Sequence, residues 1–155
     1  MRRIIAYVVR FAVILIGYAI ASLAASAFLN VLFLGYFGYA PGPGHPTIAP
    51  ALYFSVPFVA LFIAYFGFMP AAVVILIAEV LGRRDWLFYA LGGAVTAVVF
   101  LGFAHNVGDG DFDVTDNNVR LALVGSGMVG GIFYWLSAGR WAGTWRREPL
   151  LDAES

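Results

Sequence analysis

Four long runs of apolar residues dominate the chain, and short segments that are polar or rich in glycine and proline separate them. The runs cover about residues 11–34, 52–78, 86–104 and 121–139. A helix needs about 20 predominantly apolar residues to cross a hydrocarbon core of about 30 Å, and each run meets or approaches that length. The pattern therefore predicts an all-α protein, a bundle of four transmembrane helices within a single integral membrane domain, residues 1–155.

Arginine is distributed unevenly if the four helices alternate in direction across a bilayer. Eight of the nine basic residues then share the face that holds both termini. They are Arg2, Arg3, Arg10, Arg83, Arg84, Arg140, Arg146 and Arg147, and Arg120 falls on the opposite face. Cytoplasmic segments of membrane proteins carry such an excess of basic residues. We therefore expect both termini in the cytoplasm (N-in/C-in), with residues 146–155 as a short cytoplasmic tail.

Composition supports the membrane interpretation and excludes several kinds of site. Hydrophobic residues make up 62% of the chain and charged residues 12%, against roughly 25% charged in a soluble domain. There is no cysteine, which excludes disulfides, thiol nucleophiles and thiolate metal sites. We expect the lipid bilayer to be the main partner and expect no nucleic-acid partner.

Small residues recur at the spacing that lets membrane helices approach closely. Gly17, Ala21 and Ala25 repeat every four residues, and Gly127 and Gly131 form a GxxxG pair. The predicted packing residues are Gly17, Ala21, Ala25, Gly92, Gly93, Gly127 and Gly131. Their helical partners are expected either in this chain or in a second copy of it.

A polar stripe, Ser22, Ser26 and Asn30, runs beside the small residues of the first helix. The simpler interpretation is hydrogen bonding between helices of the bundle. The functional alternative is the polar edge of a cavity.

Basic and aromatic residues mark the predicted cytoplasmic boundary, where such side chains anchor helices among headgroups. The predicted anchors are Arg83, Arg84, Trp86, Trp135, Arg140, Trp141 and Trp145. Arg10 is expected to extend from the first helical turn to the same headgroups. Glu79 and Arg83 are four residues apart, a spacing that allows an ion pair on one helical face.

The two histidines and an acidic loop suggest a metal site on the outer face. His45, His105, Asp109, Asp111 and Asp113 could supply ligands for zinc or another divalent ion. The aspartates begin like a calcium-binding loop, which also needs a glycine at its sixth position and a glutamate at its twelfth. Val114 and Arg120 occupy those positions, so the calcium-loop motif fails.

No other pattern indicates a reaction or a cofactor. Gly125, Gly127 and Gly130 match the spacing of a dinucleotide fingerprint, but they lie inside an apolar helix instead of a strand–turn–helix unit. No Asp, Glu, Lys or His is expected deep in a helix. Such residues usually mark proton relays and ion-coupled transport, so their absence argues against a proton-coupled transporter and against an intramembrane enzyme.

The segment Phe-Tyr-Trp-Leu-Ser-Ala-Gly-Arg-Trp-Ala-Gly at 133–143 resembles the end of uncharacterised small four-helix inner-membrane proteins of bacteria. The resemblance covers this segment only. It implies a location in the bacterial inner membrane and implies no activity.

Three functions follow as hypotheses. The first is a non-enzymatic accessory subunit that forms a homo-oligomer or joins a larger membrane complex. The second is a small channel or transporter for a weakly polar solute or a lipid, built from the polar stripe, Thr96, Ser126 and a kink at Pro70. The third is a protein that binds a divalent metal ion on the outer face of the membrane.

Overall fold

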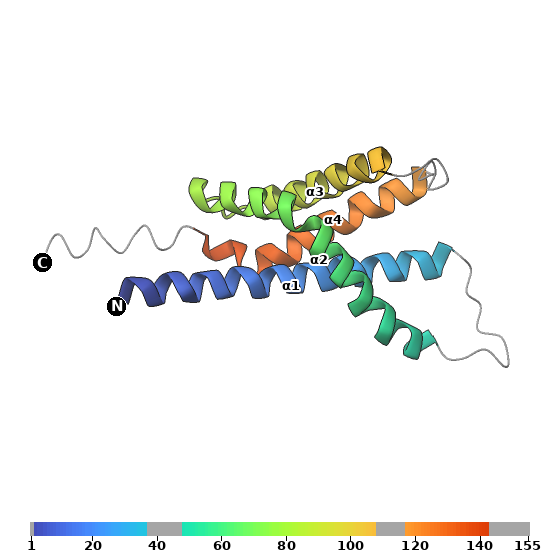
Figure 1. Ribbon diagram of the computed structural model, residues 1–155, viewed down its shortest axis with the longest axis horizontal. Coiled ribbons are helices and arrows are strands. Elements are labelled where there is room, and N and C mark those ends of the chain that lie inside the picture. Colours follow the sequence, from blue (N-terminus) through green and yellow to red (C-terminus); the bar gives the residue numbers. More distant parts are fainter. Residues whose placement is uncertain (1, 37–47, 108–116, 143–155) are drawn as a thin grey trace, which may run out of the picture.

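The computed structural model describes residues 2–36, 48–107 and 117–142. These residues form four α-helices and a short 3-10 turn, and no strand occurs among them. The helices are α1 (Arg2–Tyr36), α2 (Ile48–Leu81), α3 (Trp86–Val107) and α4 (Asn117–Ser137), and the turn is η1 (Gly139–Trp141) (Figure 1). All four helices are long and apolar enough to cross a membrane. The prediction of an all-helical protein with four such helices is confirmed.

The helices do not end where the apolar runs end. α1 has 35 residues and is therefore about 52 Å long at 1.5 Å per residue, which exceeds a hydrocarbon core of about 30 Å. It must tilt or project beyond that core. α4 ends at Ser137, before the predicted boundary at 139, because the chain tightens there into η1.

A Schellman motif ends α2. Gly82 has a φ of 61°, a left-handed conformation that glycine adopts at little cost because it lacks a Cβ atom. Its N–H donates to the carbonyl of Glu79 at 3.3 Å, and the N–H of Arg83 donates to the carbonyl of Ala78 at 3.0 Å. This local cap makes the connection through residues 82–85 sharp.

Each helix packs mainly against two others: α1 and α3 both contact α2 and α4. The contacts of α4 with α3 and with α1 are the most extensive. α1, α3 and α4 run roughly along the long axis of the molecule, whereas α2 crosses α1 obliquely (Figure 1). The start of α1, residues 82–85 and η1 lie at the same end of the bundle, as expected when successive helices alternate in direction.

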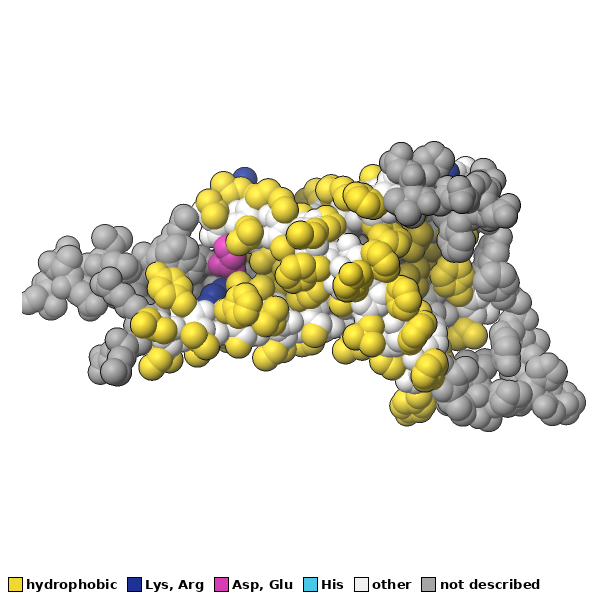
Figure 2. Space-filling view, viewed as in Figure 1, with side chains coloured by type: hydrophobic (Ala, Val, Ile, Leu, Met, Phe, Trp, Pro, Cys, Tyr) yellow, Lys and Arg dark blue, Asp and Glu magenta, His cyan; other side chains and the backbone are white. Residues whose placement is uncertain are grey.

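Small side chains fill the interior, and large apolar side chains face outward. Besides glycines, the buried residues are Ala21, Ser22, Ala25, Ser26, Leu29, Ala60, Ala78, Tyr89, Ala90, Ser126, Tyr134, Ala138 and Ala142. Hydrophobic side chains cover most of the described surface visible in Figure 2. Such a surface is unfavourable in water but suits lipid, where helices associate through close packing and hydrogen bonds. The described structure therefore has the build of a multi-pass membrane protein.

Candidate functional site

Glycines bring α3 and α4 into backbone contact. A Cβ atom at Gly93 would collide with the carbonyl of Gly127, and one at Gly131 would collide with the carbonyl of Tyr89. Backbone atoms cannot give way as the end of a flexible side chain can, so these contacts require glycine. The helix that Gly127 and Gly131 contact is thus α3 of the same chain.

A second glycine face of α4 packs against α1. A Cβ atom at Gly130 would lie 3.2 Å from the carbonyl oxygen of Ala21 and 3.3 Å from the Cβ atom of Ala25. Gly17 faces Ala138, just beyond the end of α4. The spacing of the GxxxG pair predicts one glycine face on α4. It does not predict the second face, where Gly130 packs against α1.

Gly92 and Gly93 serve different neighbours. A Cβ atom at Gly92 would collide with the side chain of Val74 in α2, whereas Gly93 faces α4. Because adjacent helical residues point in different directions, the pair lets α3 lie close to two helices at once.

The polar stripe of α1 bonds mainly to α2. The Ser26 hydroxyl donates to the carbonyl of Val56 at 2.7 Å, and the Ser55 hydroxyl donates to the side-chain oxygen of Asn30. Ser22 instead donates to the carbonyl of Tyr18 within α1. Hydrogen bonding between helices is thus the role these contacts show for Ser26 and Asn30, and Ser55 is the partner that sequence spacing did not identify.

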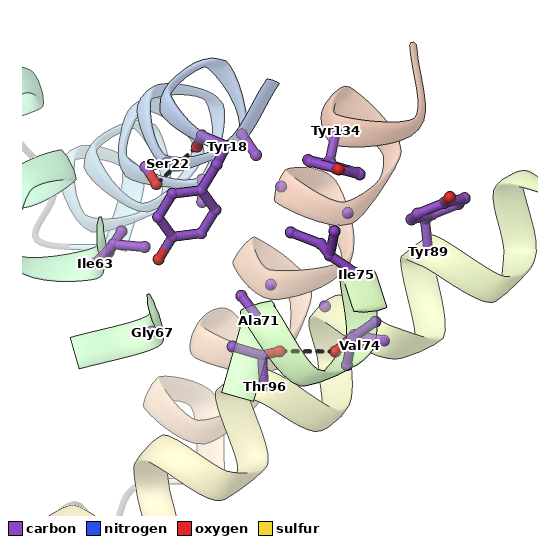
Figure 3. Close-up of a pocket in the computed structure, with 17 residues that line it drawn as sticks. Tyr18, Ser22, Ile63, Gly67, Ala71, Val74, Ile75, Tyr89, Thr96 and Tyr134 are labelled. Carbon is purple, nitrogen blue, oxygen red and sulfur yellow. Dashed lines mark hydrogen bonds between the residues drawn. The ribbon is translucent and has the colours of Figure 1, made fainter. Parts of the chain in front are cut away.

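All four helices line a cavity of about 90 Å³ in the interior of the bundle (Figure 3). It is partly open at the surface. The lining residues combine the packing glycines with three tyrosines and two smaller hydroxyl groups: Tyr18, Ala21, Ser22, Ala25, Ile63, Gly67, Ala71, Val74, Ile75, Tyr89, Gly92, Gly93, Thr96, Gly127, Gly130, Gly131 and Tyr134. The stripe residue Ser22 therefore also lies at the edge of a cavity.

Tyr134 differs from the other hydroxyl groups that line the cavity. Its side chain is 4% exposed, and its hydroxyl has no hydrogen-bond partner among the described residues. The Tyr18 hydroxyl donates to the carbonyl of Ala64, and the Tyr89 hydroxyl lies 3.2 Å from the carbonyl of Arg83. An unsatisfied buried donor costs about 1–3 kcal/mol, so the Tyr134 hydroxyl is a position where an acceptor would be stabilised.

An ion pair joins Arg10 of α1 to Glu79 of α2. Their side chains are only 16% and 12% exposed, and both residues lie within the apolar spans. The expectation that Arg10 occupies the first turn of the helix is wrong, because α1 begins at Arg2 and Arg10 lies inside the helix. Both Tyr89 and Tyr134 interact electrostatically with this pair, so it lies near the tyrosine end of the cavity.

Several predicted interface anchors also form internal contacts. The Trp135 indole donates to the carbonyl of Arg84, and the Arg84 side chain donates to the carbonyl of Ala142. These bonds fasten the connection between α2 and α3 to the end of α4. Trp86 and Trp141 are half exposed, and the Arg140 guanidinium lies 5.6 Å from the ring centroid of Trp141. Arg83 pairs with Asp85 at 3.5 Å, and Trp145 lies outside the described residues.

The predicted metal ligands lie where the structure describes no side chain. His45, Asp109, Asp111 and Asp113 are outside the described residues, and His105 is described only as part of the α3 backbone. Within the described part, no group of three or more histidine, cysteine or acidic residues could hold a metal ion. The outer-face site stays a prediction, which calorimetric titration with zinc, copper and calcium would test.

The outward face of α2 carries a ladder of aromatic rings. Phe54, Phe58, Phe62 and Phe66 follow one another at four-residue spacing, with neighbouring centroids 5.8, 5.1 and 6.1 Å apart. Tyr65 stands beside the ladder with a side chain that is 79% exposed, and its ring meets Phe66 edge-on. No hydrogen bond of its hydroxyl to another described residue is seen.

No protein-family model matches the chain, and no match was found among curated proteins or among solved structures. Its function is inferred below from the contacts described above.

Proposed function

We propose that the chain is a non-enzymatic subunit of the bacterial inner membrane that assembles with a second copy of itself through the outward face of α2. The observation that carries the proposal is Tyr65. It lies near the middle of the apolar span Leu52–Leu81, and its exposed hydroxyl has no hydrogen-bond partner among the residues that the structure describes.

A phenolic hydroxyl is poorly placed in hydrocarbon. Tyrosine is favoured at membrane interfaces, where its polar end meets water, and a hydroxyl that loses its hydrogen bonds in an apolar medium costs about 1–3 kcal/mol. A neighbouring helix that accepts or donates a hydrogen bond at Tyr65 removes that cost.

A second copy of the chain is a partner whose own Tyr65 can form that hydrogen bond. Two copies inserted in the same direction relate by a two-fold axis along the membrane normal, so a residue near the axis faces its own counterpart. Tyrosine is both donor and acceptor, and therefore a Tyr65 pair satisfies itself. The ladder rings on each side add aromatic contacts across the interface, each worth about 0.5–1.5 kcal/mol.

The non-enzymatic part of the proposal is supported by how the buried hydroxyl groups are used. The buried serines Ser22, Ser26 and Ser126 donate to backbone carbonyls, an arrangement that stabilises packing. A nucleophile would instead need a neighbouring base.

The proposed orientation places the start of α1, residues 82–85 and η1 in the cytoplasm. It is supported by the basic residues at that end, Arg83, Arg84 and Arg140, and by the positive-inside tendency of membrane proteins. A fluorescent protein that matures only in the cytoplasm, fused at the C-terminus, should give bright cells. Alkaline phosphatase, which folds only outside the cytoplasm, should be inactive at the same position; the reverse result would overturn the orientation.

The absence of cysteine makes the dimer test direct, because each introduced thiol is unique. Leu61→Cys and Met69→Cys place thiols one turn before and after Tyr65, at side chains 69% and 76% exposed. Under mild oxidation in native membranes, both should form a disulfide-linked dimer. Ile16→Cys on the exposed face of α1 is the control and should not. Equal cross-linking at all three positions, or monomers by light scattering after gentle extraction, would overturn the proposal.

The interior cavity favours a second function, the passage or storage of a small weakly polar solute. Vesicles containing the protein would release such a solute faster than empty vesicles if the cavity forms part of a path. Equal rates would remove the transport candidate without affecting the dimer.

A further inference from the structure

We propose that the interior cavity is a binding site for a small neutral molecule with a hydrogen-bond acceptor, a carbonyl or ether oxygen, which accepts a hydrogen bond from the Tyr134 hydroxyl. The proposal does not depend on dimerisation, because residues of a single chain line the cavity.

The described residues of the lining carry no charge, and one of their hydroxyl groups has no partner within the described ranges. None of the lining residues carries an ionised group, and the nearest ion pair, Arg10 with Glu79, neutralises itself. An ion would lose its hydration without gaining a partner, and therefore the occupant is neutral.

The lining hydroxyls indicate which polar group the occupant carries. Tyr18, Ser22, Tyr89 and Thr96 all have carbonyl partners within the described residues. Among the hydroxyl groups of this lining, Tyr134 alone has none in the described part of the chain. The oxygen of this hydroxyl could also accept, but only an acceptor on the occupant satisfies the unpaired O–H, so the matching group on the occupant is an acceptor.

The volume limits the size of the group that enters. An engineered apolar cavity of about 150 Å³ binds benzene, so a cavity of about 90 Å³ that is partly open admits at most a small ring or a short chain, part of which can remain in the opening. Gly67 is among the residues that border it, and a side chain at that position would reduce this space. Figure 3 shows that three of the lining residues, Tyr18, Thr96 and Tyr134, come from three different helices.

A water molecule is the competing occupant. A buried water typically makes about three hydrogen bonds, whereas the surface that lines this cavity is almost entirely apolar. An apolar molecule with one acceptor matches this lining better, because it needs only the single bond that Tyr134 can donate.

The first test compares cyclopentanone with cyclopentane, a hydrocarbon of nearly the same shape without the carbonyl. Binding to the full chain in deuterated detergent is measured by saturation-transfer NMR. Cyclopentanone should bind more tightly than cyclopentane, and Tyr134→Phe should weaken cyclopentanone binding about 3- to 10-fold, the effect of one hydrogen bond. Cyclopentane binding should stay unchanged in that variant.

Two further variants separate binding from folding. Gly67→Ala adds a methyl group at a position where its nearest neighbours lie 3.5 and 3.8 Å away, so the fold accommodates it while the cavity narrows. It should weaken binding of both probes. Gly102→Ala adds the same group where nothing lies within 4 Å and should change neither.

The acceptor could belong to a membrane lipid or to a freely diffusing solute, and mass spectrometry of the gently extracted protein distinguishes these two sources. A lipid mass retained by the natural chain and lost in Tyr134→Phe assigns the carbonyl to a membrane lipid. Cyclopentanone binding without a retained mass assigns it to a freely diffusing solute. The proposal is overturned if neither probe binds, which leaves water as the occupant, or if Tyr134→Phe affects both probes equally.

Discussion

The contact between α3 and α4 and the contact between α1 and α2 hold helices together in different ways. At α3–α4, Gly93 and Gly127 bring one backbone against the other. At α1–α2, side chains connect the helices: Ser26 reaches the carbonyl of Val56, and Arg10 pairs with Glu79. The first contact depends on the absence of side-chain atoms, and the second depends on particular polar atoms.

The difference follows from the physics of association in lipid. Lipid tails are as apolar as leucine, so burying apolar side chains does little to draw helices together, and close packing or hydrogen bonds must replace that driving force. The oblique path of α2 (Figure 1) limits the length over which its backbone can approach α1. Polar side chains bridge the helices at the points where they meet.

The largest expected effect is at the close-packed contact. Gly93→Ala puts a methyl group into the carbonyl of Gly127, so α3 and α4 must separate along their contact. We expect a loss of about 3 kcal/mol in the free energy of unfolding, the upper range for overpacking. Equilibrium unfolding in mixed micelles measures the loss, with Gly102→Ala in the same helix as the control. Equal effects of the two substitutions would show that the backbone contact does not stabilise the pair.

The ion pair should give the next largest effect. Glu79→Gln or Arg10→Met leaves a partner charge in a largely buried position, which costs 3–5 kcal/mol when burial is complete. Because both side chains are partly exposed, we expect about 2 kcal/mol for each single variant. The double variant Arg10→Met/Glu79→Met should recover part of that loss, because it leaves no unpaired charge. Additive losses in the double-mutant cycle would contradict a direct coupling between the two residues.

The smallest expected loss of stability comes from substituting serines of α1, and two of them should differ. Ser26→Ala removes a bond to α2, and Ser22→Ala removes a bond within α1. Interhelical hydrogen bonds in membranes average about 0.6 kcal/mol, so the loss from Ser26→Ala should lie near that value. Ser22→Ala should cost less than the measurement resolves. If Ser22→Ala lowers the free energy of unfolding more than Ser26→Ala does, the stripe does not stabilise the protein mainly through hydrogen bonds to α2.

The helices could be predicted from the sequence because a membrane span needs only length and apolar composition, both of which are local properties. Partners were harder to predict. The spacing of Glu79 and Arg83 suggests a pair one turn apart, whereas the structure joins Glu79 to Arg10, which only the fold brings near. Gly130 and Ser55 escaped prediction for the same reason, since each acquires its role from a neighbouring helix.

Tyr134 shows what sequence patterns cannot reveal about a site. Its position after the glycines of α4 indicates an aromatic residue near the membrane boundary, and its neighbours indicate an anchor. Only the packed structure shows that its hydroxyl is enclosed beside a cavity with no partner in the described part of the chain. Enclosure depends on all four helices together.

The glycine cap of α2 has a consequence for how the protein is made. The cap consists of Gly82 and two hydrogen bonds that the carbonyls of Ala78 and Glu79 accept, all within a few residues of one another. The bend between α2 and α3 can therefore form without any other part of the chain. The two segments can therefore leave the ribosome and enter the bilayer as one hairpin, before α4 has been synthesised. The last helix then meets a partially assembled structure, and the bonds from Trp135 and Arg84 close the bundle around it.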